Sequence, residues 1–371
     1  LGWMNVVTWN RDYGSPPVDS SVATDPAAVG TQTPEQAAAD AATAAANAQL
    51  PALPTGQPTT EAVATTDPTA PAGPVATGQP SIRVVTDVLD LDISLQGGDF
   101  VRADLLQYPR DKRPGSPPVR LFGTQEPDYS VARSGLRVLN GRPEPTHLAT
   151  FTSTANEFRL APGATELRVP LSWNDGLGVT VTKTYVFRPG SYAIEVLYDV
   201  DNRSESEWSG ASYVQLARHV YAQERSMFDV ESYAYRGPAV WDGNKYRKLD
   251  VDDDEDGRYA QNVTDGWMAT MQHHFVSAAV PPKGEEYHVT LAREGSHALL
   301  THRGPLKTVP AGTTGRFSET IFVGPKLQDQ LKEVGPRLEL TADYGKLTIL
   351  SQPLFWLLQK VHGFVGNWGW S

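Results

Sequence analysis

Residues 89–99 read Leu-Asp-Leu-Asp-Ile-Ser-Leu-Gln-Gly-Gly-Asp, and the alternation of apolar and polar residues gives the first indication of the fold. Apolar side chains at every second position lie on one face of a strand. Positions 89, 91, 93 and 95 therefore predict a half-buried strand at the end of Ile82–Leu95. The Gly-Gly-Asp sequence is typical of a turn, and Phe100–Tyr108 can return as a second strand. This part of the chain predicts an antiparallel hairpin.

Similar patterns recur along the chain up to residue 324. Further strand candidates lie at 179–187, 192–200, 211–221, 267–280, 287–292 and 316–323. Turns rich in Pro, Gly, Asn and Asp separate them, and they do not alternate with helical segments, which disfavours a parallel α/β sheet. The sequence predicts a mainly β fold, a large antiparallel β-sandwich over residues 81–324.

The pattern becomes helical after residue 324. In Pro325–Val334 apolar residues recur at spacings of four and three, which predicts a short surface helix within a helical segment of residues 325–346. Between residues 347 and 365 a wide apolar and aromatic face leaves only a narrow polar side. Such a helix can pack in the core of the sandwich, or it can lie flat in a membrane interface. In the second case the side chains at the interface are Leu354, Phe355, Trp356, Leu358, Lys360, Val361, Phe364, Trp368 and Trp370.

The N-terminal part of the chain has a different composition. Residues 14–80 are rich in Ala, Thr and Pro and contain no aromatic residue. Such a segment buries too little apolar surface to offset the entropy lost on ordering, so we expect a disordered linker. Residues 1–13 contain Trp3 and Trp9, which suit the aromatic belt at the end of a membrane anchor; an amphiphilic tail or an early strand is the alternative. Because the sequence opens on Leu1 and stops after an apolar stretch, we expect a fragment of a longer protein.

Charge and composition exclude several classes of function. The chain has 43 acidic and 32 basic residues, a net charge of −11, and no run of five or more basic residues. Phosphate binding needs a basic stripe, so a generic nucleic-acid partner is not expected. The absence of Cys excludes disulfides, thiolate metal sites and a thiol nucleophile. No stretch reaches the ~18 consecutive apolar residues of a membrane span.

Two sequence motifs resemble metal-binding sites. Asp252–Gly257 resembles the start of an EF-hand loop, but Val263 stands where the bidentate Glu should be, so we expect an exposed acidic turn without calcium. His273 and His274 are adjacent on a strand candidate, and neighbouring side chains on a strand point to opposite faces. We therefore do not expect them to share a metal.

The rest of the sequence contains few patterns typical of catalytic or ligand-binding residues. His297 and His302 lie in sequence typical of loops, and no His-Glu-x-x-His spacing, nucleophile elbow or phosphate-binding glycine loop occurs. The sequence thus predicts no catalytic, cofactor-binding or metal site. One alternative stays open: Trp173, Trp208, Trp241 and Trp267 can stack sugars, and a carboxylate pair about 5–10 Å apart can hydrolyse them. A carbohydrate-binding or sugar-processing β-sandwich remains possible on these residues.

Several longer strings resemble a known family. Gly266-Trp-Met-Ala-Thr-Met-Gln-His-His-Phe275, Ile321-Phe-Val-Gly-Pro-Lys326, Ile349-Leu-Ser-Gln-Pro-Leu-Phe-Trp356 and Val361-His-Gly-Phe-Val-Gly-Asn-Trp-Gly-Trp-Ser371 resemble the YidC membrane protein insertases of Gram-negative bacteria. The resemblance extends over roughly residues 82–371. Its aromatic-rich C-terminal block is the specific part.

The resemblance implies a β-supersandwich, similar to the galactose mutarotase-like fold, followed by C-terminal α-helices. It implies a domain at residues 81–324 in the periplasm, a bacterial inner-membrane location, and an interfacial helix at 347–371 that leads to a second transmembrane helix. The implied function is assistance in insertion and folding of inner-membrane proteins, without enzyme activity and without a cofactor. The implied partners are nascent inner-membrane proteins, the Sec translocon with its accessory subunits, and the lipid bilayer. The Arg-containing insertase groove of the family would lie beyond Ser371.

Overall fold

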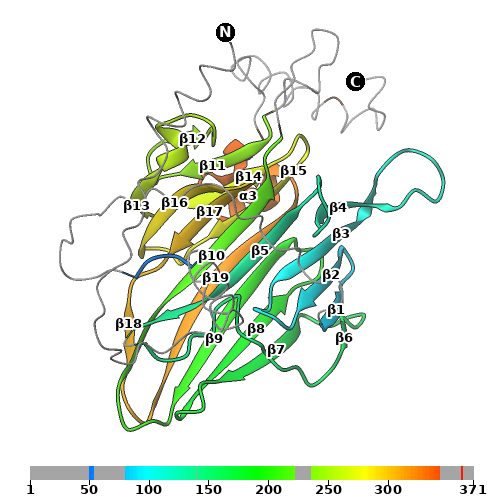
Figure 1. The fold of residues 1–371 in the computed structure, drawn as a ribbon. Coiled ribbons are helices and arrows are strands. Elements are labelled where there is room, and N and C mark those ends of the chain that lie inside the picture. Colours follow the sequence, from blue (N-terminus) through cyan, green and yellow to red (C-terminus); the bar gives the residue numbers. More distant parts are fainter. Residues whose placement is uncertain (1–49, 54–79, 140, 222–234, 343–360, 362–371) are drawn as a thin grey trace, which may run out of the picture. The chain divides into compact units, whose positions relative to one another are not determined.

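The computed structural model describes residues 50–53, 80–139, 141–221, 235–342 and 361. All the elements given below belong to residues 50–371. Figure 1 shows that these elements are almost entirely strands, arranged in two sheets. The mainly β class predicted from the sequence is therefore confirmed.

The first sheet has eleven strands (Figure 1). In spatial order they are β13 (Ala260–Thr264), β16 (Glu286–Glu294), β17 (His297–Arg303), β10 (Trp208–His219), β5 (Ser130–Val138), β3 (Phe100–Pro109), β2 (Leu89–Ser94), β1 (Ser81–Val85) and β6 (Glu157–Arg159). In addition, β18 (Lys307–Val309) pairs with β10 and β4 (Pro118–Phe122) pairs with β3. Neighbours are antiparallel except β1 and β6, which are parallel.

The second sheet has eight strands, all antiparallel. Their order is β12 (Tyr246–Lys248), β11 (Gly237–Trp241), β14 (Trp267–Met271), β15 (Phe275–Val280), β19 (Thr313–Pro325), β9 (Ala193–Asn202), β8 (Val179–Phe187) and β7 (Leu167–Asn174). One apolar core takes side chains from both sheets. It includes Leu91 and Ile93 of the first sheet and Val181, Tyr198 and Ile321 of the second, all fully buried. Alternate residues of β2 supply this core, as the period-two pattern predicts, whereas β14 is buried along its whole length.

Two predicted strands are in fact pairs of strands. Ile82–Leu95 divides into β1 and β2, because the Thr86 hydroxyl accepts the amides of Val88 and Leu89 at 3.2 and 2.9 Å and turns the chain. Residues 267–280 divide into β14 and β15. The intervening Gln-His-His has none of the residues typical of turns, so sequence pattern alone missed this hairpin.

Helices are few in the described residues. Between residues 80 and 342 they are α3 (Gln328–Val334) and the 3-10 turns η2 (Asp256–Arg258) and η3 (Leu338–Thr341). The predicted helix at 325–334 begins later than expected because Pro325 is still the last residue of β19. Within the ranges that the structure covers, no helix has both the length and the apolar character needed to cross a bilayer.

Candidate functional site

The predicted membrane-interface residues mostly fall outside the described ranges. Val361 is the exception; it is helical and half-buried. The others are Trp3, Trp9, Leu354, Phe355, Trp356, Leu358, Lys360, Phe364, Trp368 and Trp370. Most of the predicted linker at 14–80 also lies outside, because only its residues 50–53 and 80 are described. The choice between an interfacial helix and a core helix at 347–365 therefore stays a prediction.

The histidine predictions need correction. His273 and His274 lie in the turn between β14 and β15, where the alternation of a strand does not apply, and their rings stack with centroids 4.0 Å apart. His297 and His302 are not in loops: both belong to β17. His302 is fully buried, and its Nε2 lies 3.1 Å from Oε2 of Glu319. His297, in contrast, is partly exposed, and its ring contacts other ionisable side chains near the protein surface.

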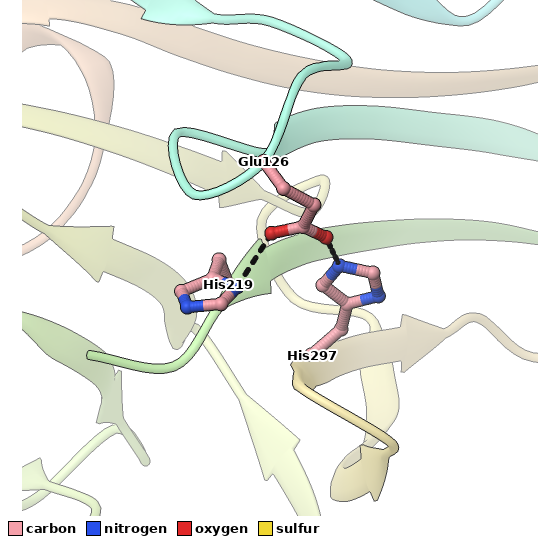
Figure 2. A group of neighbouring side chains, drawn as sticks. All are labelled: Glu126, His219 and His297. Carbon is pink, nitrogen blue, oxygen red and sulfur yellow. Dashed lines mark hydrogen bonds and ion pairs between the residues drawn. The ribbon is translucent and has the colours of Figure 1, made fainter. Parts of the chain in front are cut away.

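His297 belongs to a cluster with Glu126 and His219, which we call the Glu-His-His cluster (Figure 2). His219 ends β10 and His297 begins β17, and the two are register partners in the antiparallel pair of these strands. Residues directly opposite in such a pair present their side chains on the same face. Glu126 comes from the loop between β4 and β5, and its carboxylate lies between the two rings.

The contacts within the cluster are short. Oε1 of Glu126 lies 2.5 Å from Nε2 of His297, and Oε2 lies 2.6 Å from Nδ1 of His219. The side chains of His219 and His297 are 22% and 17% exposed and that of Glu126 is 50% exposed. The two imidazoles are thus held by the sheet, whereas the carboxylate is reachable from solvent.

Aromatic side chains support this arrangement. The Tyr129 ring stacks on the His297 ring with centroids 4.2 Å apart. Tyr221 donates a hydrogen bond from its hydroxyl to Oδ1 of Asp128 at 3.0 Å, and its ring meets the edge of His219 at 5.2 Å. The backbone amide of His219 donates to the carbonyl of Tyr129 at 2.9 Å. These contacts fix the loop that carries Glu126 against β10 and β17.

A pocket of about 320 Å³ borders the cluster, because His219 lines it and Ala298 follows His297. The other lining residues include Arg218, Tyr235, Asp250 and Asp252. Burial lowers the pKa of Arg218, whose guanidinium lies 5.8 Å from the Tyr221 ring. The two carboxylates of the pocket are engaged: Asp252 pairs with Arg293, and Asp250 accepts the amide of Asp252 at 3.0 Å.

The acidic turn that resembles an EF-hand loop lies beside this pocket. Asp252 to Glu255 are exposed, as predicted, and Oδ1 of Asp256 lies 3.1 Å from Nη2 of Arg247. Val263 is buried in β13. The carboxylates of the turn thus have arginine partners at both of its ends.

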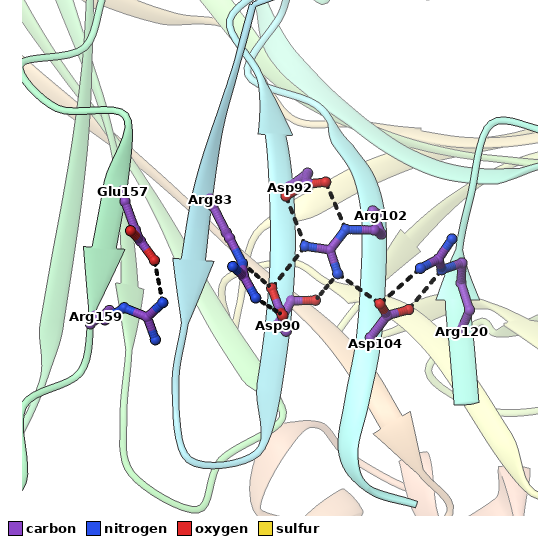
Figure 3. A network of polar contacts seen from close by, with 8 residues as sticks. All are labelled: Arg83, Asp90, Asp92, Arg102, Asp104, Arg120, Glu157 and Arg159. Carbon is purple, nitrogen blue, oxygen red and sulfur yellow. Dashed lines mark hydrogen bonds and ion pairs between the residues drawn. The ribbon is translucent and has the colours of Figure 1, made fainter. Parts of the chain in front are cut away.

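Other carboxylates converge on neighbouring strands of the first sheet (Figure 3). Arg102 on β3 contacts Asp90, Asp92 and Asp104 at 2.8, 2.6 and 2.7 Å. Arg83 binds Asp90 at 2.6 Å, and this hydrogen bond lowers the pKa of Asp90. A further arginine, Arg120, binds Asp104 at 2.7 Å. We call this set the Arg-Asp ladder. Arginine-bound carboxylates have their lone pairs occupied, which suits a structural role better than proton transfer.

The predicted tryptophan platform is wrong for two of its four members. Trp208 and Trp267 are only 1% exposed, because they pack inside the sandwich. The indole Nε1 of Trp267 donates to the carbonyl of Pro336 at 2.8 Å. Trp173 and Trp241 are partly buried against the same core. An aromatic surface for sugar stacking is therefore not formed by these four residues.

No local sequence pattern indicated the Glu-His-His cluster. Glu126, His219 and His297 are separated by up to 171 positions, and each lies in an ordinary context for its strand or loop. A register prediction for β10 and β17 would have placed the two histidines opposite one another. Short-range spacing rules for metal ligands do not detect such a pair.

Comparisons with known proteins give a consistent result. The family model of the YidC periplasmic domain matches residues 81–357. The membrane protein insertase YidC of Methylococcus capsulatus is 42% identical over 301 residues, which is 80% of this chain and 54% of that protein. The protein of the same name from Pseudomonas putida strain W619 is 36% identical over 383 residues, 100% of this chain and 64% of that protein. The chain thus spans about half to two thirds of the length of these curated relatives.

Solved structures offer a more distant likeness. A galactose mutarotase related enzyme from Lactobacillus acidophilus matches with a TM-score of 0.43 at 8% identity, covering 66% of this chain and 97% of that one. A putative aldose 1-epimerase from Escherichia coli K12 matches with a TM-score of 0.38 at 10% identity, covering 66% and 98%.

Proposed function

Because this chain belongs to the YidC periplasmic domain family, we propose that it is the periplasmic part of a membrane protein insertase that assists the insertion and folding of inner-membrane proteins. The observation that carries the proposal is the family match over residues 81–357, which includes the whole sandwich. The proposed partners are nascent inner-membrane proteins, the Sec translocon with its accessory subunits, and the bilayer. The proposed location is the bacterial inner membrane, with the sandwich in the periplasm.

The proposed arrangement along the chain follows its composition. Residues 1–13 would end an N-terminal anchor and 14–80 would form a linker to the sandwich at 81–324. Residues 325–346 would close the domain, and 347–371 would form the interfacial helix that leads to a second transmembrane helix. Support comes from the long apolar and aromatic face of 347–365, which a lipid interface stabilises in proportion to the area buried.

A non-catalytic role for the domain is part of the proposal. The carboxylates of the Arg-Asp ladder are bound to arginines, and Trp208 and Trp267 are in the core. The sugar-processing alternative is tested by incubating the chain with aldoses and with aryl glycosides. We expect neither mutarotation nor hydrolysis above the buffer rate. Activity that is lost on replacing a carboxylate of the pocket, such as Asp250→Asn, would favour the alternative.

A hybrid insertase tests the main proposal. The corresponding region of the Pseudomonas aeruginosa insertase, 35% identical over 396 residues, is replaced by residues 1–371 and the hybrid is reconstituted in proteoliposomes. We expect insertion of a nascent inner-membrane protein, measured by protease protection, at a rate close to that of the unmodified insertase. A second hybrid carries an unrelated soluble β-sandwich in place of residues 81–342. If both hybrids insert equally well, or both fail, the proposed contribution of this domain is refuted.

Vesicle binding tests the interfacial helix. Withdrawing about 100 Å² of an indole from water is worth about 2.5 kcal/mol, so Trp356→Ala should weaken flotation with inner-membrane lipid vesicles by more than tenfold. The matched control is Leu177→Ala, which removes an apolar side chain that is 59% exposed on the sandwich. We expect no change in flotation for this control. Unchanged flotation together with unfolding of Trp356→Ala would instead assign the helix to the core.

A further inference from the structure

The Glu-His-His cluster has the composition of a metal site. Two imidazole nitrogens and one carboxylate oxygen, one atom from each residue, all lie within 4.8 Å of one another. Nothing in the proposed insertase role requires three ionisable side chains to meet here. We propose that Glu126, His219 and His297 bind a divalent transition-metal ion, with Zn²⁺ as the expected ion.

The choice of ion follows from the ligand types. Neutral imidazole nitrogen is a good ligand for Zn²⁺, whereas Mg²⁺ and Ca²⁺ prefer oxygen atoms only. Two histidines and one carboxylate are a known ligand set for zinc, and a fourth tetrahedral position then remains for water or for a ligand atom of another molecule. The cluster therefore favours zinc over the alkaline-earth ions of the periplasm.

The geometry needs only a small adjustment. With metal–ligand bonds of about 2.0–2.2 Å, ligand atoms around a tetrahedral ion lie about 3.3 Å apart. The present contacts, a hydrogen bond of 2.5 Å to His297 and an ion-pair contact of 2.6 Å to His219, are both shorter than this, so the carboxylate must move away from the two rings. Glu126 can do so because its side chain is 50% exposed, whereas β10 and β17 hold the two histidines at matched register positions.

The surroundings support ordered ligands. The Tyr129 ring fixes the plane of the His297 imidazole, and the Tyr221 ring contacts the His219 imidazole. These ring contacts restrict the orientation of the two imidazoles. A bound ion would join the β4–β5 loop to β10 and β17, three segments that are far apart in the sequence. Since the ion binds the folded state, it would raise the stability of the sandwich.

Zinc titration of the full chain without an affinity tag tests the proposal. Competition with a chromophoric chelator should show one Zn²⁺ per chain with a micromolar or tighter dissociation constant, and Zn²⁺ should raise the melting temperature. His219→Ala and Glu126→Gln should each weaken binding by at least about tenfold. Glu126→Gln guards against loss of folding, because Glu126 lies on an exposed loop.

Two controls separate this cluster from other histidines. His288→Ala removes a half-buried imidazole on β16 whose Nδ1 lies 2.7 Å from the Asn262 side chain, and it should leave the affinity unchanged. The double variant His273→Ala/His274→Ala removes the stacked pair and should also bind normally. The absence of saturable binding, or binding that is lost in the His273/His274 variant but kept in His219→Ala, would overturn the assignment.

Discussion

At the scale of single residues, His147 is a histidine whose burial disfavours its charged form. Its side chain is 4% exposed, and its amide donates to the Tyr213 hydroxyl at 3.0 Å. The same hydroxyl lies 2.7 Å from Nδ1 of His147 and can donate its hydrogen there. Burial, reinforced by nearby arginine and lysine charges, lowers the pKa of His147 to about 3. The imidazole is therefore neutral in the folded protein at neutral pH.

Acidification should unfold the domain partly through this residue. Between pH 6.5 and about pH 3 the unfolded chain binds a proton at His147 that the folded chain does not, so the free energy of unfolding falls as the pH falls. The slope from this group reaches about 1.4 kcal/mol per pH unit. Urea unfolding at pH 7, 6, 5 and 4 should show a shallower pH slope for His147→Gln than for the natural sequence. Exposed His274→Gln is the control; equal slopes for His147→Gln and the natural chain would contradict the prediction.

At the scale of elements, the β2–β3 hairpin depends on the glycines of its turn. Gly97 has φ +74°, and a Cβ there would lie 2.5 Å from the backbone of His147. The Gly97 amide donates to the carbonyl of Ala149 at 2.7 Å, so this close approach is part of the fold. Gly115 has a similar φ of +79° but has open space around it. Substitutions at the two positions can therefore be compared to separate the cost of a positive φ from the cost of steric overlap.

Substituting both glycines tests that distinction. Gly115→Ala should lower the free energy of unfolding by about 1–2 kcal/mol, the cost of a left-handed alanine. Gly97→Ala carries the same strain and must also displace the His147 backbone, so we expect a loss larger by about 2 kcal/mol or more. Urea denaturation of the two variants measures the difference. Equal losses would show that the turn can shift away from His147 without cost.

The Arg-Asp ladder joins β2, β3 and β4 through side chains. Asp90 and Asp104 are directly opposite in the β2–β3 pair, and like charges in this position repel. Arg102 lies between them, with a side chain only 19% exposed. Without Arg102, no positive charge would lie between these two carboxylates, and they would repel one another more strongly.

We therefore expect Arg102→Met to destabilise the domain by about 2–4 kcal/mol at pH 7. The penalty should shrink on acidification. The lowered pKa of Asp90 means that its ion pairs stabilise the fold above its ordinary pKa of 3.8, and this stabilisation is lost as the pH falls through the folded value. Arg113→Ala, which removes an arginine that is 85% exposed, should change stability by less than about 0.5 kcal/mol. A pH-independent penalty for Arg102→Met would argue for lost packing rather than lost charge pairing.

At the scale of the whole sandwich, two buried polar groups connect the sheets across the apolar core. Lys183 on β8 donates from Nζ to the carbonyls of Gly97 and Ser134 at 2.8 and 2.9 Å. Burial lowers the pKa of Lys183 to about 7 and raises that of nearby Asp99 to about 7. Glu319 on β19 accepts hydrogen bonds from Ser212 and Tyr287 of the first sheet at 2.7 and 3.1 Å. Such groups fix how the two sheets face one another.

Removing the Glu319 carboxylate should have a large effect. Glu319→Ala leaves the Ser212 and Tyr287 hydroxyls and His302 without their common partner in a site that is 1% exposed, so we expect a loss of about 3–5 kcal/mol. Glu319→Gln keeps one oxygen acceptor and should lose less than half as much. Thermal and urea unfolding measure both variants. Identical losses would show that the negative charge, rather than hydrogen-bond acceptance, matters here.

The sequence by itself determined the class of fold. Alternation at residues 89–95 and the glycine turn at 97–98 are local properties, because side-chain direction in a strand and backbone freedom at glycine depend on near neighbours in the chain. The antiparallel sandwich and the change to helix after residue 324 follow from such patterns. The family relationship also rests on the sequence, through strings such as Gly266–Phe275.

The tertiary structure decided what lies face to face. The split of residues 267–280 into β14 and β15, the burial of Trp208 and Trp267, and the pairing of His219 with His297 depend on strand register and on which sheet covers which face. The period-two pattern shows which side chains of a strand share a face, but it does not show which distant strand lies next to it. The Glu-His-His cluster exists only because β10 and β17 pair in one register and the loop before β5 folds back onto them.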